Sequence, residues 1–132
     1  MSPHAVILRH TLPDASTHLD LLLERAPPDA AAAANPDDRR LIAFRLPDPL
    51  PDPPEGLIDA TRLPDHRAHY LTHEGPIGDN RGHVARILRA PLVHLVESPD
   101  ACSARLRAPD HDLLFEATRV HAQHWRIALS RP

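Results

Sequence analysis

Proline interrupts this chain so often that no long helix is expected in it. The sequence of 132 residues holds 16 prolines and only 4 glycines, and the apolar runs between them are short. Proline removes a backbone donor and clashes with the preceding turn of a helix, whereas short apolar runs bounded by turn residues are typical of strands. The pattern favours an antiparallel barrel or sandwich. We therefore expect a mostly β fold, a small antiparallel β-barrel with short connecting helices or turns.

The expected strands are runs of β-branched and apolar residues between turn-forming residues. The run 17–24 (THLDLLLE) is the clearest, because its leucines alternate with more polar residues. We expect a loop with one turn of alanine helix at 25–38, a proline-rich connector at 47–56 and a turn at 75–82. The expected strands are 4–11, 17–24, 39–46, a stretch within 57–75 that Pro64 breaks, 83–88, 92–97, 103–107, 112–117 and 124–129. The length predicts a single domain, 1–132.

The composition limits the classes of function. A single cysteine, Cys102, excludes an intramolecular disulfide and a cysteine-based zinc site. The net charge of −3 does not suggest a non-specific polyanion binder, and 11 histidines favour a metal or phosphate site. The N-terminus lacks the pattern of a signal peptide, and no apolar stretch approaches membrane-spanning length. We expect a cytoplasmic protein with no membrane partner.

Two histidines and a carboxylate stand close together at the edges of the first two expected strands. His18 and Asp20 lie two residues apart, so on a strand they share a face about 6.5–7 Å apart. His10, at the end of the neighbouring strand, would complete a facial set of metal ligands that suits Mn(II), Fe(II) or Zn(II). A solvated strand face explains the same residues without a metal. The spacing alone leaves both interpretations open.

A second polar cluster lies in the run LPDHRAHYLTHEGPIGDNRG at 63–82. His66 and Tyr70 are four residues apart, with His69 and His73 interleaved. An imidazolium and a phenol beside a metal can bind a phosphoryl group by charge and by hydrogen bonding. The alternative is that the histidines are inert loop residues and that Tyr70 packs in the core with its hydroxyl at the rim.

Taken in order, the runs VILRH…THLDLLLE, LPDHRAHYLTHEGPIGDNRG and LLFEATRVHAQHWRIAL resemble the 3′-phosphoesterase domain of bacterial ATP-dependent DNA ligase D. The resemblance covers about residues 6–129 and is greatest to short stand-alone relatives of that domain. It implies a β-barrel whose central crevice binds Mn(II) through His10, His18 and Asp20, although another divalent metal would also suit them. It also implies that His66 and Tyr70 are catalytic and contact the phosphate.

The reaction implied by the resemblance belongs to DNA repair by end joining. The family removes a terminal ribonucleoside and then the remaining 3′-phosphate from a DNA primer, leaving a 3′-hydroxyl. The implied partners are nucleic-acid 3′ ends and a separately encoded DNA ligase.

The chain departs from the family's pattern in part of its phosphate clamp. Leu22 stands where the family has an arginine, Pro64 where it has an acid, and Ile58 where it has a second arginine. The His10-to-His18 spacing is also two residues longer than in the ligase-attached domains. A guanidinium–phosphate contact is a strong charge-assisted interaction, so its loss should slow catalysis. Candidate replacements are Arg81, Arg67 and Arg9. Arg81 is the best of the three as a phosphate-binding residue, because it stands in a glycine-flanked turn, and the alternative is that it is an ordinary exposed turn residue.

Three functions remain at this point. The first is an Mn(II)-dependent phosphoesterase that trims 3′-phosphate or 3′-ribonucleotide ends of DNA. The second, which Leu22 favours, is a catalytically weak or inactive module that binds a metal or a nucleic-acid end and partners a DNA ligase. The third is a small-molecule phosphoesterase, which the negative net charge would tolerate.

Overall fold

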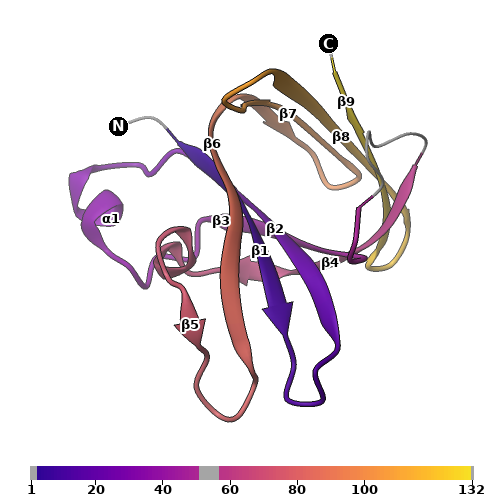
Figure 1. Cartoon of the computed structure of the whole chain (residues 1–132). Helices are drawn as coiled ribbons and strands as arrows, with labels where there is room; N and C mark the ends of the chain where they lie inside the picture. Colours follow the sequence, from indigo (N-terminus) through magenta and orange to yellow (C-terminus); the bar gives the residue numbers. More distant parts are fainter. Residues whose placement is uncertain (1–2, 51–56, 132) are drawn as a thin grey trace.

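The structure is a computed structural model that describes residues 3–50 and 57–131. It confirms the expected small antiparallel β-barrel (Figure 1). The strands are β1 (His4–Thr11), β2 (Thr17–Glu24), β3 (Leu41–Leu46), β4 (Ile58–His66), β5 (Gly75–Pro76), β6 (His83–Glu97), β7 (Ala101–Arg107), β8 (Asp112–His121) and β9 (His124–Ser130). The helices are α1 (Ala30–Ala34) and the 3₁₀ turn η1 (Ala68–Leu71). Of the expected 47–56 connector, residues 51–56 lie outside the described part.

Eight strands form the ring, in the order β1-β2-β3-β4-β9-β8-β7-β6, and the pairing of β6 with β1 closes it. Every pairing is antiparallel. The two-residue β5 pairs with β6 outside the ring. The β1–β2 and β5–β6 hairpins extend together at one end of the barrel, while α1 and η1 lie on one side of it (Figure 1). Within the described residues, no helix is long and apolar enough to cross a membrane.

Two expectations about proline were wrong. Pro64 does not break its strand: β4 continues to His66, because a register shift against β3 falls between the pairs at Leu63 and His66. A bulge needs no ladder donor from the proline. The expected strands 83–88 and 92–97 are one strand of 15 residues that runs through Pro91. Pro91 is tolerated because β6 changes partner there, from β1 to β7.

The barrel strands β1, β2 and β3 are covered on both faces. Their inward residues join an interior core to which all eight ring strands contribute, including Leu21, Phe44, Phe115 and Trp125. Their outward residues belong to a second, smaller apolar cluster that also includes Leu71 of η1. Its buried members are Val6, Leu8, Leu22, Leu41, Ala43, Leu71 and Val84. The 66–77 segment therefore covers the outer face of the barrel wall, and the polar residues of interest lie at the edge of this contact.

Candidate metal and phosphate site

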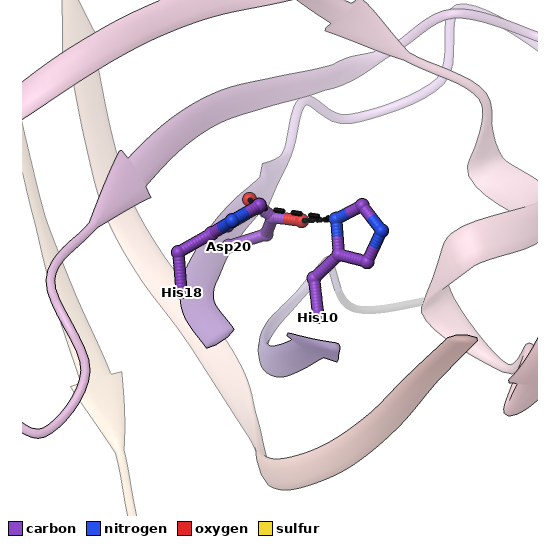
Figure 2. A group of neighbouring side chains, drawn as sticks. All are labelled: His10, His18 and Asp20. Carbon is purple, nitrogen blue, oxygen red and sulfur yellow. Dashed lines mark hydrogen bonds and ion pairs between the residues drawn. The ribbon is translucent and has the colours of Figure 1, made fainter. Parts of the chain in front are cut away.

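The antiparallel pairing of β1 with β2 brings the predicted metal ligands together. His10 lies directly opposite His18, and Asp20 follows two residues later on the same face of β2. The His10 Nδ1 atom is 3.1 Å from His18 Nε2 and 3.8 Å from Asp20 Oδ2, and His18 Nε2 is 3.2 Å from Asp20 Oδ1. Figure 2 shows the His10 ring and the Asp20 carboxylate facing each other, with His18 beside them. All three side chains thus point to one place on the outer face of the barrel wall.

These separations suit a shared metal ion. Ligand atoms at about 2.0–2.2 Å from a metal, in tetrahedral or octahedral positions, lie about 3–3.5 Å from one another. Two of the three separations fall in that range, and all the donor atoms lie within 4.8 Å of one another. Two imidazoles and one carboxylate accept Mn(II), Fe(II) or Zn(II), so the set does not select among these metals.

The tautomer of His10 is set by a backbone contact. Its Nε2 lies 2.7 Å from the carbonyl oxygen of Arg81. A carbonyl only accepts hydrogen bonds, so Nε2 carries the proton and the lone pair of Nδ1 faces His18 and Asp20. Metal-binding histidines typically make such a hydrogen bond through their other nitrogen.

Gly82 allows this contact to form. It has a φ of +93°, and a Cβ at this position would overlap the carbonyl oxygen of Thr11. Only glycine fits such a close approach of two backbones without displacement. Gly82 therefore lets the 78–82 turn approach the end of β1, which brings the Arg81 carbonyl to His10.

Burial makes the cluster costly without a cation. Asp20 is 7% exposed and His18 9% exposed. Although His18 Nε2 is close to Asp20 Oδ1, the directions do not suit a hydrogen bond, and this buried oxygen has no donor among the described residues. Burial raises the pKa of Asp20 and lowers that of His18. An unsatisfied buried carboxylate oxygen next to two imidazole nitrogens fits a cation site.

A cavity of about 280 Å³ opens beside the metal ligands. His10 and Asp20 lie on one wall, while Leu8, Leu22 and Val84 supply apolar surface from the barrel strands. The rest of the lining comes from β3, β4 and the segment between β4 and β6. The other lining residues are Arg45, Leu63, Pro64, His66, Tyr70, Ile77 and Arg81. We call this the inner cavity, and Asp20 is the single carboxylate among its lining residues.

Arg45 is the residue that sequence reasoning missed. It is the cross-strand partner of Asp20 in the β2–β3 pair, so both side chains leave the sheet on the same face. It is exposed, lines the inner cavity and forms no ion pair within the described part of the chain, although its charge favours the ionised form of Asp20. The sequence offered one indication of this residue, because Arg45 is the only charged residue in the run LIAFRL. The register that sets it opposite Asp20 is not encoded in that run.

His66 and Tyr70 both line the inner cavity, as their predicted role requires. The carbonyl of Pro64 lies 2.8 Å from His66 Nδ1, which therefore carries a proton, so Nε2 is the nitrogen left for a ligand. The His66 and Tyr70 rings are 5.9 Å apart, because η1 brings the fourth residue after His66 back beside it. The interleaved His69 and His73 do not line the inner cavity; their rings stack on each other at 4.6 Å.

The three arginines that could replace the missing clamp residue lie in different places. Arg81 lines the inner cavity, and its Nε donates to the carbonyl of Gly78 at 2.8 Å, which leaves its terminal nitrogens for a ligand. Arg67 lines an adjoining cavity instead. Arg9 pairs with Asp48 at 2.8 Å and lines neither of these two cavities.

The departures from the family's pattern also have definite positions. Leu22 is fully buried in the outer apolar cluster and forms part of the inner cavity wall. Ile58 is buried in the barrel interior, where an arginine would be unpaired. Asp65 contacts Arg25 at 2.7 Å and Arg62 at 3.5 Å. It therefore ties the end of β4 to the barrel.

Comparison with protein-family models and with curated proteins found no match to this chain.

Proposed function

We propose that this protein is a metal-dependent phosphoesterase that acts on the 3′ ends of DNA, with Mn(II) as its ion. The observation that carries the proposal is the inner cavity, which combines a metal-ligand set with a ring of anion-binding groups. His10 and Asp20 line this cavity, and His18 Nε2 lies 3.2 Å from Asp20 Oδ1. The anion-binding groups are Arg45, His66, Tyr70 and Arg81.

The charges in the inner cavity favour a phosphate as the ligand. Arg45 and Arg81 have no carboxylate partner among the described residues, and Asp20 is positioned to bind the metal. Two guanidinium groups with free donors suit the tetrahedral oxygens of a phosphate, which they can bind through paired hydrogen bonds. A neutral sugar or an apolar ligand would leave these charges without a partner.

In the proposed hydrolysis, a water molecule attacks phosphorus, and the bond between phosphorus and the 3′ oxygen breaks. The products are inorganic phosphate and a DNA end with a 3′-hydroxyl. Arg45 and Arg81 hold the non-bridging oxygens and stabilise the charge that develops on them. His66 donates from Nε2 to a phosphoryl oxygen when it is protonated, and Tyr70 donates from its hydroxyl. When bound by the trio, the metal supplies Lewis-acid polarisation and lowers the pKa of bound water.

The main sequence feature that speaks against catalysis is Leu22 in the position of the family's arginine, and Arg45 supplies a guanidinium nearby. The family's clamp arginine falls at Leu22, whose neighbour in the next strand is Ala43, two residue pairs along the ladder from the Asp20–Arg45 pair and on the same face. Arg45 leaves the same face of the sheet and reaches the same cavity. The chain therefore offers a guanidinium from β3 in place of the one missing from β2. The specific substrate, a DNA 3′ end in repair, rests on the sequence resemblance.

The test is a turnover assay on a DNA primer–template that ends in a 3′-phosphate, and on one that ends in a 3′-ribonucleotide. The protein is assayed with Mn(II), Zn(II) and excess chelator. We expect Mn(II)-dependent release of phosphate that His18→Ala abolishes. His121→Ala, which removes an exposed histidine on the β8–β9 hairpin, is the matched control and should retain the activity.

A second candidate is a module that binds a metal or a DNA end and hands it to a separately encoded DNA ligase. The observation that favours it is the fully buried Leu22 in the position of the family's arginine. No phosphate release from either substrate, at a protein concentration where Mn(II) binding is confirmed, would exclude the enzyme and favour this module. Release from small phosphomonoesters alone would instead identify a small-molecule phosphoesterase.

A further inference from the structure

A second cavity of about 340 Å³ adjoins the inner one and shares His66, Tyr70 and Arg81 with it. Its remaining lining residues are Arg39 and Arg67, so it contains no carboxylate side chain. We call it the outer cavity. Three guanidinium groups and an imidazole around a space of this size form a site for an anion. The shared residues make it continuous with the cavity that the proposed substrate phosphate occupies.

The guanidinium groups of the outer cavity differ in how they are held. Arg67 pairs with the exposed Asp37 at 2.9 Å, and its guanidinium lies over the Tyr70 ring at 5.7 Å from the centroid. Arg39 makes a single long contact of 3.4 Å to the carbonyl of Asp65. Neither Arg39 nor Arg81 has a carboxylate partner in the described part of the chain. Arg67 is thus held in place before a ligand binds, while the guanidinium groups of Arg39 and Arg81 remain available to a ligand.

We propose that the outer cavity binds a second phosphate group of the same substrate, the phosphodiester next to the terminal phosphate. This inference rests on the proposed function, because it takes the inner cavity as the place of the terminal phosphate. It assigns Arg39 and Arg67 to the phosphodiester that precedes the terminal nucleotide. A mononucleotide with a single phosphate would fill the inner cavity and leave the cations of the outer one unpaired.

The test compares three probes, of which the two dinucleotides differ only in one charge. They are thymidine 3′-monophosphate, a thymidine dinucleotide ending in a 3′-phosphate, and the same dinucleotide with a neutral methylphosphonate internal linkage. We expect kcat/KM for the charged dinucleotide to exceed that for the methylphosphonate about tenfold to a hundredfold, mainly through KM. The methylphosphonate keeps both bases, so base stacking cannot produce this difference.

Variants assign the preference to the outer cavity. In Arg67→Gln and in Arg39→Gln, we expect the ratio of charged to neutral dinucleotide to fall toward one. Arg107→Gln removes the same charge from the end of β7, outside both cavities, and should leave the ratio unchanged. Equal kcat/KM for the charged and neutral dinucleotides in the unaltered protein would overturn the inference, as would a ratio that neither arginine variant reduces.

Direct binding separates this inference from the proposed function. The affinities of the two dinucleotides are measured by calorimetry with Mn(II) present. If no probe is hydrolysed but the affinity ratio is large and falls in Arg67→Gln, the outer cavity is a phosphate site and the enzyme proposal fails. If the probes are hydrolysed with equal kcat/KM and bound with equal affinity, the enzyme proposal stands and the second phosphate site is excluded.

Discussion

The two faces of β2 serve different purposes, although both are largely buried. On the inward face, Leu19, Leu21 and Leu23 join the large apolar cluster of the barrel interior. On the outward face, His18 and Asp20 sit at the edge of a much smaller apolar cluster. A core stabilises by removing apolar area from water, whereas a buried carboxylate without a donor destabilises. The comparison indicates that the outward face gives up stability for binding.

The largest expected effect comes from the inward face. Leu21 is fully buried in the barrel interior, so Leu21→Ala should lower the free energy of unfolding by about 2–5 kcal/mol through lost burial and a cavity. Chemical denaturation followed by tryptophan fluorescence measures this, because Trp125 lies in the same core. A loss below about 1 kcal/mol would contradict the assignment of Leu21 to a tightly packed interior.

The outward face should respond in the opposite way. His18→Ala should weaken Mn(II) binding by more than the ~10–100-fold that loss of an outer-sphere partner costs, because it removes a direct ligand. In metal-free buffer its free energy of unfolding should change far less than that of Leu21→Ala. Calorimetric titration with Mn(II) and parallel denaturation measure the two quantities. An unchanged Mn(II) affinity would rule out the proposed metal site.

Gly82 links the turn to the metal ligands, so its substitution tests the positioning of His10. Gly82→Ala should displace the turn from Thr11 and weaken the contact of the Arg81 carbonyl with His10. We expect Mn(II) affinity to fall by about 10–100-fold, the range for loss of an outer-sphere partner. Gly78→Ala is the matched control, since a Cβ there meets nothing within 4 Å and its φ is not positive. Equal affinities in the two variants would contradict this role of Gly82.

Arg45 tests whether the cavity binds a phosphate at all. Arg45→Gln should leave Mn(II) affinity within a few-fold and lower kcat/KM for the 3′-phosphate substrate by about 10–100-fold. The reason is the loss of one charge-assisted contact to the phosphate, which is worth about 1.5–3 kcal/mol. Steady-state kinetics measure the change, with Arg107→Gln as the control. A normal kcat/KM would remove Arg45 from the phosphate site.

The smallest expected effect concerns the ion pair between Arg25 and Glu97, which lies just after the end of β2. Arg25 follows β2 and donates to Glu97 through Nε at 2.7 Å and Nη2 at 3.0 Å. This hydrogen bonding lowers the pKa of Glu97, so the pair stabilises the fold above the ordinary pKa of the carboxyl group and loses that effect as the pH falls through the lowered value. Solvent screening keeps the contribution small.

Glu97→Gln should therefore destabilise the protein by about 0.2–1 kcal/mol at neutral pH. The difference from the unaltered protein should shrink as the pH falls through the lowered pKa of Glu97, because the carboxyl group then becomes protonated in the folded state as well. Denaturation curves at several pH values measure it. Glu116→Gln makes the same charge change at an exposed position of β8 and is the matched control. A difference that grows in acid would contradict the assignment.

The sequence by itself determined most of the strands and the faces that they present, although not the strands that run through Pro64 and Pro91. Alternation in 17–24 requires His18 and Asp20 to leave β2 on the side opposite Leu19, Leu21 and Leu23. A short turn between two strands brings His10 opposite His18, and the four-residue spacing of His66 and Tyr70 keeps them together in η1. These features depend on residues near one another in the chain, so local physical chemistry is enough to predict them.

The tertiary structure alone decided what meets across the chain. The closure of the barrel by β1 and β6, the passage of β6 through Pro91 and the bulge at Pro64 depend on strand register, which no local pattern specifies. The position of Arg45 opposite Asp20 and the hydrogen bond between the Arg81 carbonyl and His10 also depend on contacts between distant parts of the chain. The cavity formed by these residues lies on the outer face of the barrel wall, because a covering segment packs there and leaves a space beside the buried charges.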